Sequence, residues 1–515
     1  MDEFILTKDG KELIYCFGAA KELMVPDGVE IIIDRAFASN RSEKIILNEG
    51  LLEIGESAFA NCTELKEIIL TDSLQSLGVE AFYNCSSLLS VHIGANLSAS
   101  YVPTAYFGIN LRTITLSEEN PYMKLVEGVL YTADGKALLL YPAKDARESY
   151  TVLEGTEILE EWSLAGARYL KELILPSSLK EIKMASIASC ISLRELVIPD
   201  SVHTIEKFAI EDNTRLLALT LGTGLKNFDD DAIRFCDKLT EIYNRSSLQM
   251  QTYTMTCSSG IYKDVTVYSD PTASKLETDE NGFVLYKEGD NTILVDYVGE
   301  ATNTLTIPSG VTEIGQGSMT NLTFYLDTVI LPDSVVKIGA RAFQRQKFLE
   351  KVVCGTGLKE IDNEAFALCE NLSTIEINSK LDRIGTNAFS RTAILPWNET
   401  ETVYIGEYFL YAPYLDESII IEEGTILLAD HSIWRARGDE AEWMVLPKSI
   451  QSLGNPQTTD AYASPKIIYY CGSESEWSKV EYVELLKGST VYFYSETRVK
   501  NGWRYVDGIP TAWSI

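Results

Sequence analysis

Histidine, cysteine and basic side chains are all scarce in this sequence. Its 515 residues hold three histidines and nine cysteines, and 44 lysines and arginines stand against 75 aspartates and glutamates, a net charge of −31. So acidic a chain repels nucleic acid and anionic membranes, which argues against either as the main partner. The small, odd number of cysteines also excludes a disulfide-based scaffold.

Long apolar runs are missing as well. No run reaches the roughly 18 to 20 residues needed to cross a bilayer, so we expect no transmembrane segment. The start, Met1 to Ile5, has neither the basic stretch nor the apolar core of a secretory signal. Two locations stay open: a cytoplasmic protein, or an exported one whose signal lies outside this sequence. The hydrophobic content of 45% nevertheless excludes a disordered chain.

The reactive side chains show no catalytic or metal-binding pattern. His92, His203 and His431 are far apart in the sequence, with no nucleophile or carboxylate at catalytic spacing. There is no Cys-x-x-Cys or His-Glu-x-x-His motif. The run Asp229–Asp231 lacks the alternating donors and the glycine of a calcium loop, so a solvated acidic turn is favoured over a calcium site. We predict a non-enzymatic protein without cofactor or metal, because no motif supports an enzyme site in an insert.

What the sequence does contain is a repeat of 23 residues. Cys62 and Cys85 lie 23 residues apart, a spacing typical of repeat architectures. The segment 48–70, NEGLLEIGESAFANCTELKEIIL, aligns with 71–93, TDSLQSLGVEAFYNCSSLLSVHI. With weaker copies included, the chain holds about 14 units. We number the unit from 1 to 23 along 48–70, so that apolar residues recur at positions 4, 7, 12, 18, 21 and 23 and cysteine recurs at position 15.

Each unit combines a strand with a short turn-like segment. In 65–70, Ile68 points to one side of the strand and Glu67 and Ile69 point to the other. The segment 57–60 suits a single helical turn. One unit cannot bury its own apolar side, so units must stack, with position 21 of one repeat packed on position 21 of the next. This predicts an α/β solenoid with a curved parallel β-sheet, its strands about 4.8 Å apart.

The repeated pattern L-x-x-I-x-I, followed by P-[DS]-S-[VL]-x-x-I-G-x-x-A-F-x-x-C, resembles the BspA-like class of bacterial leucine-rich repeats. Segments 65–82 and 350–366 carry it most clearly, and the resemblance covers roughly 26–470. It implies a leucine-rich repeat solenoid, on the bacterial cell surface or secreted, with an adhesive or host-protein-binding role. The cysteine of position 15 is replaced at Asn40, Ala167, Asn213 and Gln346.

Four predicted β-hairpins divide the repeats. Thr7–Leu13 and Thr132–Leu138 share the pattern T-x-D-G-K-x-L, and Asp-Gly between apolar runs is a strong hairpin signal. The segments 283–297 and 402–411 are divergent versions. We expect the hairpins to extend one edge of a continuous solenoid, where they bend it or shield part of its concave face. The predicted segments are 1–116, 117–244, 245–401 and 402–470, each a hairpin with a block of repeats, and 471–515, a β-rich C-terminal cap.

Two further segments have alternative interpretations. The Tyr- and Trp-rich tail is interpreted as a cap that closes the last repeat, and a carbohydrate-binding patch at Trp477, Trp503 and Trp513 is the alternative. Cys62 and Cys85 should stack in adjacent repeats with parallel Cβ vectors. That geometry is unfavourable for a disulfide, so reduced, buried thiols are favoured.

The outward strand positions 20 and 22 are the candidate protein-binding site. They place glutamates beside branched aliphatic side chains, and like charges about 5 Å apart on adjacent strands cost stability unless a partner offsets them. The alternative is that β-branched residues simply favour strands. A basic or host-derived protein partner, bound more weakly at high salt, fits this concave face. The candidate residues are Glu67, Ile69, His92, Thr115, Glu172, Ile174, Glu195, Val197, Thr220, Glu241 and Tyr243.

These observations leave two functions in competition. The leading hypothesis is a non-enzymatic protein-binding or adhesion module at a bacterial cell surface, and the alternative is an intracellular scaffold of the same fold.

Overall fold

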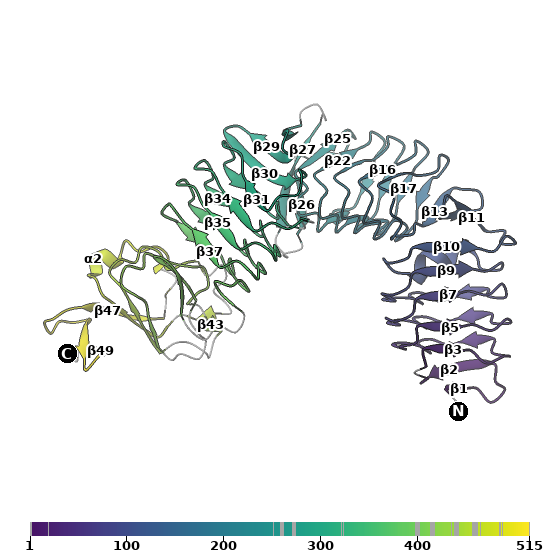
Figure 1. Cartoon of the computed structure of the whole chain (residues 1–515), viewed down its shortest axis with the longest axis horizontal. Coiled ribbons are helices and arrows are strands. Elements are labelled where there is room, and N and C mark those ends of the chain that lie inside the picture. The colour runs from purple at the N-terminus through teal and green to yellow at the C-terminus, as the bar shows by residue number, and fades with distance from the viewer. Residues whose placement is uncertain are drawn as a thin grey trace. The chain divides into compact units, whose positions relative to one another are not determined.

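The computed structural model divides the chain into two compact units, 1–274 (unit 1) and 275–515 (unit 2). Each unit is a solenoid of stacked parallel strands about 23 residues apart, which confirms the predicted leucine-rich repeat solenoid (Figure 1). Helix is nearly absent from the described residues. The structure describes 3–513 except 19, 251, 258–261, 270–273, 321, 323, 397–401, 412–417, 434, 437–441, 456–461, 464, 484–485 and 487.

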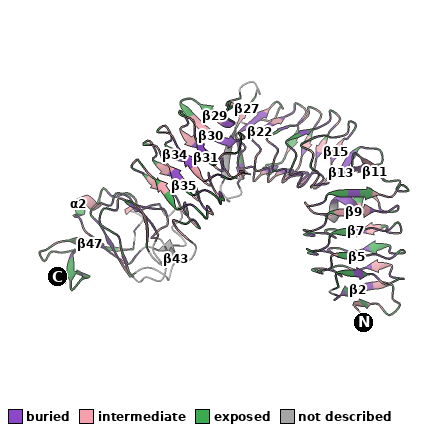
Figure 2. Ribbon diagram, viewed as in Figure 1, coloured by how far each residue is buried: buried purple, intermediate pink, exposed green. Residues whose placement is uncertain are grey.

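Each repeat presents three faces, which we name by their backbone structure. The long-strand face holds the strands at positions 20–22, the short-strand face holds two-residue strands at positions 6–7, and the turn face spans positions 9–15. Parallel pairing joins equivalent residues of successive repeats, such as Glu67 with Ser90 and Ile54 with Leu77. Figure 2 shows the alternation of buried and exposed residues that results along the strands.

In unit 1 the long-strand face is divided into three groups. The first contains β3 (Glu22–Met24), β5 (Lys44–Ile46), β7 (Glu67–Ile69), β9 (Ser90–Ile93) and β10 (Thr113–Leu116). The second contains β14 (Ser149–Thr151) and β16 (Glu172–Ile174), and the third contains β19 (Glu195–Val197), β22 (Ala218–Leu221), β25 (Glu241–Asn244), β27 (Tyr262–Tyr268) and the antiparallel β26 (Thr252–Thr256).

The other two faces of unit 1 have shorter strands. The short-strand face contains β4 (Ile31–Ile32), β6 (Glu53–Ile54) and β8 (Ser76–Leu77), then β15 (Ile158–Leu159), β17 (Glu181–Ile182), β20 (Thr204–Ile205) and β23 (Asn227–Phe228). The turn face contains β18 (Ile187–Ala188), β21 (Ile210–Glu211) and β24 (Ile233–Arg234), and the helices η1 (Ala99–Tyr101) and α1 (Val102–Ala105) lie between β9 and β10 in sequence.

Unit 2 repeats the same plan. Its long-strand face contains β31 (Thr304–Thr306), β33 (Thr328–Ile330), β35 (Lys351–Val353) and β37 (Thr374–Glu376), then β41 (Ser418–Ile420), β44 (Trp443–Leu446), β46 (Ile467–Tyr470), β47 (Thr490–Tyr494), β48 (Gly502–Val506) and β49 (Ile509–Ala512). Its short-strand face contains β32 (Glu313–Ile314), β34 (Lys337–Ile338), β36 (Glu360–Ile361), β38 (Arg383–Ile384) and β42 (Leu427–Leu428). The remaining elements are β28 (Leu276–Thr278), the pair β43 (Arg435–Ala436) and β45 (Tyr462–Ala463), and α2 (Glu474–Trp477).

All four predicted hairpins are antiparallel strand pairs. They are β1 (Phe4–Leu6) with β2 (Glu12–Cys16), β12 (Val129–Thr132) with β13 (Ala137–Leu140), β29 (Phe283–Glu288) with β30 (Asn291–Tyr297), and β39 (Val403–Ile405) with β40 (Tyr408–Tyr411). A further strand, β11 (Met123–Val126), pairs with β12. The second strand of each hairpin then pairs in parallel with the next short strand, so each hairpin supplies the first strand of a short-strand sheet. The division into five segments remains a prediction.

The interior consists of ladders of identical apolar positions. Position 12 stacks its phenylalanines, and the rings of Phe59 and Phe82 lie 5.2 Å apart and nearly parallel. Unit 2 repeats this with Phe343 and Phe366, also 5.2 Å apart. Position 21 forms the second predicted ladder, as in Ile68, which is fully buried. Stacked repeats therefore share one continuous interior within each hydrophobic cluster.

The turn face corrects one expectation. The segment 57–60 is a run of turns rather than a helical turn. Ser57, whose φ is +52°, and Phe59 donate their N–H groups to the carbonyl oxygens of Val79 and Ala81 in the next repeat. In a helix these N–H groups would bond to carbonyl oxygens four residues earlier in the chain. Here they bond to the next repeat, so the stacking of repeats prevents a helical turn.

Position 15 is explained by a hydrogen bond between repeats. The Cys62 thiol donates to the carbonyl oxygen of Phe37 (3.1 Å), and the Asn213 amide makes the equivalent bond to Ile187 (2.8 Å). Cysteine and asparagine are therefore interchangeable donors at this position, whereas Ala167 has no donor to offer. The same bond is made by Cys85, Cys190, Cys236, Gln346 and Cys369.

The cysteines are reduced, as predicted. None of the nine forms a disulfide, and all are buried except the partly exposed Cys471. Burial raises the pKa of the Cys190 and Cys369 thiols to about 12, so they stay protonated and act as small apolar side chains with a weak donor.

The tail continues the solenoid, and it buries one of the three tryptophans of the alternative carbohydrate-binding patch. Strand β47 pairs in parallel with β46, which extends the long-strand sheet. Trp503 is fully buried, and its indole N–H donates to the carbonyl oxygen of Tyr470 (2.8 Å). The carbohydrate-binding alternative is therefore wrong for Trp503, because a buried ring cannot stack on a sugar.

Candidate functional site

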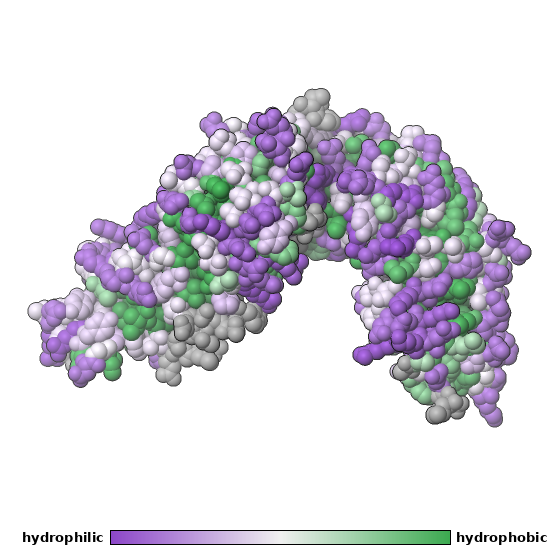
Figure 3. Space-filling model, viewed as in Figure 1, coloured by the Kyte–Doolittle hydropathy of each residue, from purple (hydrophilic) through white to green (hydrophobic). Residues whose placement is uncertain are grey.

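The long-strand face of unit 1 carries most of the predicted site residues on its outer side. The side chains at position 22 form an apolar row: Ile69 is 48% exposed, Ile174 is 44% exposed and Val197 is 55% exposed. Met24 begins the same row and is 66% exposed, although it is not among the predicted site residues. The sequence pattern that could have identified Met24 is the strand-like alternation of Glu22–Met24 just before the turn at Pro26. Figure 3 shows hydrophobic side chains in strips between hydrophilic ones on the surface of the stacked repeats.

The acidic row at position 20 is interrupted. Glu67 lies between Lys44 and Ser90 in the strand register, so it has no carboxylate as its nearest neighbour. Glu172 and Glu195 occupy successive repeats, and Glu172 accepts a hydrogen bond from the Ser149 hydroxyl (2.6 Å). Only this pair fits the predicted row of like charges.

The same pair coincides with a break in the sheet. Among the described residues, the strand ladder does not join β16 to β19, although the two strands belong to successive repeats and are in contact. Like charges on neighbouring strands are unfavourable, and here they face each other where strand pairing is missing. The exposed carboxylates of Glu67 and Glu195 have no ion-pair partner within the described part of the chain.

Two predicted residues are not on the exposed face. Glu241 is fully buried and accepts hydrogen bonds from the hydroxyls of Tyr243 and Ser274 (3.0 Å for Ser274). Tyr243 is 4% exposed, and burial, followed by the hydrogen bond to Glu241, raises the pKa of its hydroxyl. The positions were misassigned because the pairing of β27 beyond β25 and the segment that reaches Ser274 lie outside the 23-residue pattern.

The remaining predicted residues are polar and exposed or half-buried. His92 and Thr115 lie on adjacent strands, and the His92 Nδ1 is 2.9 Å from the Thr115 hydroxyl. Thr220 is half-buried beside Val197 in the strand register. These side chains divide the apolar row into two exposed stretches, one on β3–β7 and one on β16–β19.

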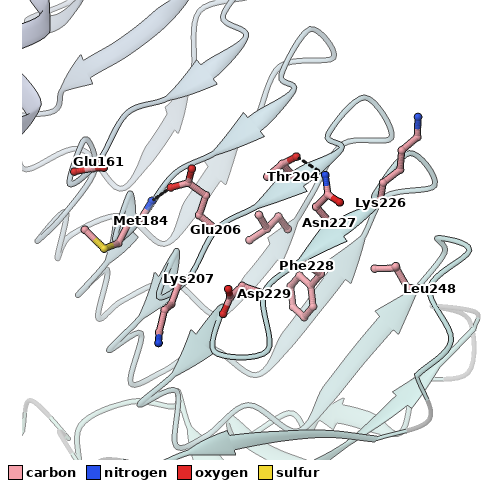
Figure 4. Close-up of a pocket in the computed structure, with 11 residues that line it drawn as sticks. Glu161, Met184, Thr204, Glu206, Lys207, Lys226, Asn227, Phe228, Asp229 and Leu248 are labelled. Atoms are coloured by element: carbon pink, nitrogen blue, oxygen red, sulfur yellow. Dashed lines mark hydrogen bonds between the residues drawn. The ribbon is translucent and has the colours of Figure 1, made fainter.

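A groove on the short-strand face of unit 1 was not foreseen. It has a volume of about 660 Å³ and lies over β20 and β23 (Figure 4). Asn227 donates to the Thr204 hydroxyl (3.2 Å) on its floor, next to Phe228, whereas Lys226 extends away from it. The Glu206 carboxylate accepts the N–H of Met184 (3.0 Å) at its other end. The groove offers hydroxyl, amide and carboxylate groups around one aromatic ring.

The acidic run beside this groove forms a tight turn. Asp229 accepts the N–H of Asp231 (2.9 Å), and Asp231 forms an ion pair with Lys207 (3.1 Å). Across the described residues, no group of three or more His, Cys, Asp or Glu side chains is arranged to hold a metal ion.

The short-strand face of unit 2 carries a charge network. Arg383 contacts the carboxylates of Glu360 (2.6 Å), Asp362 (3.0 Å) and the buried Asp430 (2.8 Å). Burial raises the pKa of Asp430, despite its contact with Arg383. Burial also opposes the ionisation of Asp362, but the Asn363 N–H and the charge of Lys337 hold its pKa below the usual value. These carboxylates already form ion pairs with Arg383 inside the fold.

Comparison with known families then decides what the repeat is. The profile of the BspA type leucine rich repeat region matches six copies, over residues 11–124, 144–260 and 297–414. The chain belongs to the BspA-type leucine-rich repeat family. Such repeats are typical of bacterial surface proteins, and leucine-rich repeat proteins generally bind other proteins.

Solved structures similar to this BspA-type chain include three bacterial proteins. The pneumococcal vaccine antigen PcpA is 20% identical over 73% of this chain and 82% of its own, with a TM-score of 0.37. A leucine-rich cell surface protein from Faecalibacterium prausnitzii A2-165 is 17% identical over 93% of this chain and 95% of its own, with a TM-score of 0.28. A leucine-rich repeat protein from Bacteroides ovatus is 15% identical over 96% of this chain and 99% of its own, with a TM-score of 0.26. No curated protein matches the chain.

The BspA-type repeats of this chain contain very little helix within the described residues. The described helices, η1, α1 and α2, have three or four residues each. None of the helices in the described part of the chain has the length and apolar character of a membrane span.

Proposed function

We propose that this BspA-type chain is a non-enzymatic binding module that holds a partner protein on the long-strand face of unit 1 at a bacterial cell surface. The observation that carries the proposal is the exposed aliphatic row of Ile69, Ile174 and Val197. The row forms two exposed apolar stretches with polar side chains beside them, and exposed apolar patches rimmed by polar groups are typical of protein interaction sites.

The charges beside this row favour a basic partner. Glu67 and Glu195 are exposed and lack ion pairs within the described residues. An incoming lysine or arginine would therefore form new pairs rather than compete with existing ones. Rim charges of this kind act mainly on association rate and orientation, so binding should weaken as salt rises. The aliphatic row would supply most of the affinity by leaving water.

The test is capture of a partner by the full chain, with reversed charge on the proposed face. The variant carries Glu67→Lys, Glu172→Lys and Glu195→Lys, and it omits Glu241 because that residue is buried. Partners captured from cell extracts and identified by mass spectrometry should be lost by this variant. Added salt should weaken their capture by the wild-type chain.

A matched control carries the same change of charge elsewhere in unit 1. The exposed residues Glu49, Glu53 and Glu64 lie off the long-strand face, so their change to lysine should leave capture intact. Equal loss in both variants would show that net charge alone governs capture, and unchanged capture by the first variant would refute the proposed face. Fractionation of the source cells with an antibody tests the location, since a protein found only in the cytosol is no surface adhesin.

A further inference from the structure

One strand of the long-strand face has an unpaired edge inside unit 1. Strand β14 pairs only with β16, because the hairpin of β12 and β13 interrupts the sheet between β10 and β14. Successive residues of a strand direct their backbone groups to opposite sides. Val152 donates its N–H to the Ile174 carbonyl oxygen of β16, and the backbone groups of Tyr150 point to the same side. The backbone N–H and C=O groups of Ser149 and Thr151 therefore face the open edge.

This edge has no partner in the described structure. No hydrogen bond from any described residue reaches the N–H or the C=O of Ser149 or Thr151. Exposed edges of this kind pair readily with an additional strand. Native sheets commonly block them with proline, a bulge or a covering loop, and β14 contains neither proline nor a bulge.

A preformed groove lies along the open edge. It has a volume of about 460 Å³, and its opposite wall comes from Val126, Glu127 and Tyr131 of the strands β11 and β12 and the turn between them. In the sheet order β12 lies between β11 and β13, and Figure 1 shows this part of the chain next to β10, where the long-strand sheet is interrupted. The groove follows β14 along its whole length, because its lining includes every residue of that strand.

Hydrogen bonds at both ends join the two walls of the groove. At one end the Arg147 guanidinium donates to the carbonyl oxygen of Glu127 (2.8 Å) and lies 5.3 Å from the centre of the Tyr150 ring. At the other end the Tyr131 hydroxyl contacts the Tyr150 hydroxyl (2.5 Å) and accepts the N–H of Leu153 (3.2 Å). A groove with fixed walls reduces the entropy that an incoming strand would lose.

The side chains around the groove carry negative charge, which favours a basic ligand. Arg147 is neutralised by Asp145 at 2.6 Å, which leaves the carboxylates of Glu127 and Glu154 on the walls and Glu172 on the next strand. The Glu127 side chain is 78% exposed, and its contact with Arg147 is long at 3.8 Å. The local charge available to a ligand is therefore negative.

We propose that β14 receives an extended, lysine- or arginine-containing segment of a partner protein, which adds to the sheet as an extra strand. Main-chain hydrogen bonds to Ser149 and Thr151 would supply affinity, and pairs with Glu127 and Glu172 would supply the preference for basic residues. This binding uses the edge of β14 and not the apolar row, and it shares only Glu172 with the proposed function, so Thr151→Pro tests it separately from the charge-reversed face.

The direct test uses the full chain and a fluorescein-labelled peptide of alternating lysine and valine. Fluorescence anisotropy should show binding at least about tenfold tighter than for the same peptide with glutamate in place of lysine. Amide hydrogen exchange should slow at Ser149 and Thr151 when the peptide is added. Equal affinity for the acidic peptide, or protection elsewhere only, would overturn the proposal.

The decisive variant is Thr151→Pro, which removes an edge donor that makes no native hydrogen bond. Thr306 occupies the equivalent edge position on β31 in unit 2, so Thr306→Pro is the matched control. We expect Thr151→Pro to weaken peptide binding at least about tenfold and Thr306→Pro to leave it unchanged. If the two variants weaken peptide binding equally, or if Thr151→Pro has no effect on it, the peptide does not bind at the edge of β14.

Two further measurements keep the result interpretable. If Thr151→Pro fails to fold, Glu127→Lys tests the same groove from its exposed wall and should also weaken binding of the lysine peptide. Sedimentation of the wild-type chain detects self-association. A dimer that Thr151→Pro abolishes would make a second copy the occupant and overturn the proposal of a basic partner segment.

Discussion

The short-strand faces of the two units use the same strand positions for different chemistry. In unit 2 the first residues of successive strands alternate in charge, whereas in unit 1 they are mostly uncharged and carry an open groove. The inward residues of the same strands stay apolar in both, and they are aliphatic except for Phe228 in unit 1. The first residues are Glu313, Lys337, Glu360 and Arg383 in unit 2, and Ile158, Glu181, Thr204 and Asn227 in unit 1.

The two faces differ at the outward positions of the repeat and agree at the inward ones. Inward side chains must match their neighbours above and below, so they remain alike from unit to unit. Outward side chains meet either one another or solvent. Where they pair with one another, as around Arg383, the face contributes to stability; where they remain unpaired, the face is available to a ligand.

The largest expected effect tests whether the two interiors are equivalent. Phe82→Ala and Phe366→Ala each remove a fully buried ring that stacks on both neighbours in its ladder. Each change should lower the free energy of unfolding by about 3–5 kcal/mol, because it loses buried area and leaves a cavity. Urea unfolding followed by hydrogen exchange in each unit measures both. A cost in one unit that is less than half the cost in the other would break the equivalence.

The second prediction tests the outward difference. Arg383→Ala leaves Asp430, whose side chain is 2% exposed, without its cation, and should cost about 2–3 kcal/mol. At the equivalent register position of unit 1, Asn227→Ala should cost less than about 0.5 kcal/mol, because Asn227 is exposed. The free energies of unfolding from urea titrations decide. Similar costs would show that the charge network contributes nothing specific to unit 2.

A third prediction concerns the inter-repeat hydrogen bond at position 15. Asn213 donates to the Ile187 carbonyl and accepts the N–H of Cys190 (2.8 Å). Asn213→Ala should therefore cost about 2 kcal/mol, since two buried backbone groups lose their partner. Asn213→Cys restores the donor alone and should cost less, as measured by urea unfolding. If the alanine and cysteine variants are equally unstable, the donor is not what position 15 requires.

The smallest effect contrasts the two α-helices. Helix α1 of unit 1 has no side-chain cap, whereas α2 of unit 2 has a capping box between Ser473 and Glu476. The N–H of Ser473, then Lys448 and the Ser473 hydroxyl, lower the pKa of Glu476 to about 2. The stabilisation is therefore complete above the ordinary pKa of 4.5 and is lost as the pH falls through about 2. NMR titration of the Glu476 carboxyl should show this midpoint, and Ser473→Ala should raise it.

The sequence alone predicted what the repeat itself determines. The 23-residue period predicted the buried Ile68, the exposed Glu67 and Ile69 and the reduced Cys62, because stacking forces equivalent residues into equivalent environments. The T-x-D-G-K pattern predicted its hairpins for a local reason. In both copies the aspartate, Asp9 or Asp134, accepts the N–H of the lysine two residues later.

The failures lie where non-repeating segments meet the repeats. Glu241 fits position 20 perfectly, but Ser274 and Tyr243 enclose it, and the former is too far away in sequence for any local pattern. The open edge of β14 was also invisible, because a pattern of side chains does not reveal which backbone groups lack a partner. The predicted function of the exposed row itself stays a prediction.

The four hairpins have a consequence for how the chain folds. In a solenoid the costly step is the first rung, since every later strand adds to an existing template. Because each hairpin brings its own two strands together through a turn of a few residues, it supplies that template from local contacts. We therefore expect the four hairpins to be preferred sites for nucleation. We expect each block to begin folding as it leaves the ribosome, without waiting for the blocks before it to finish.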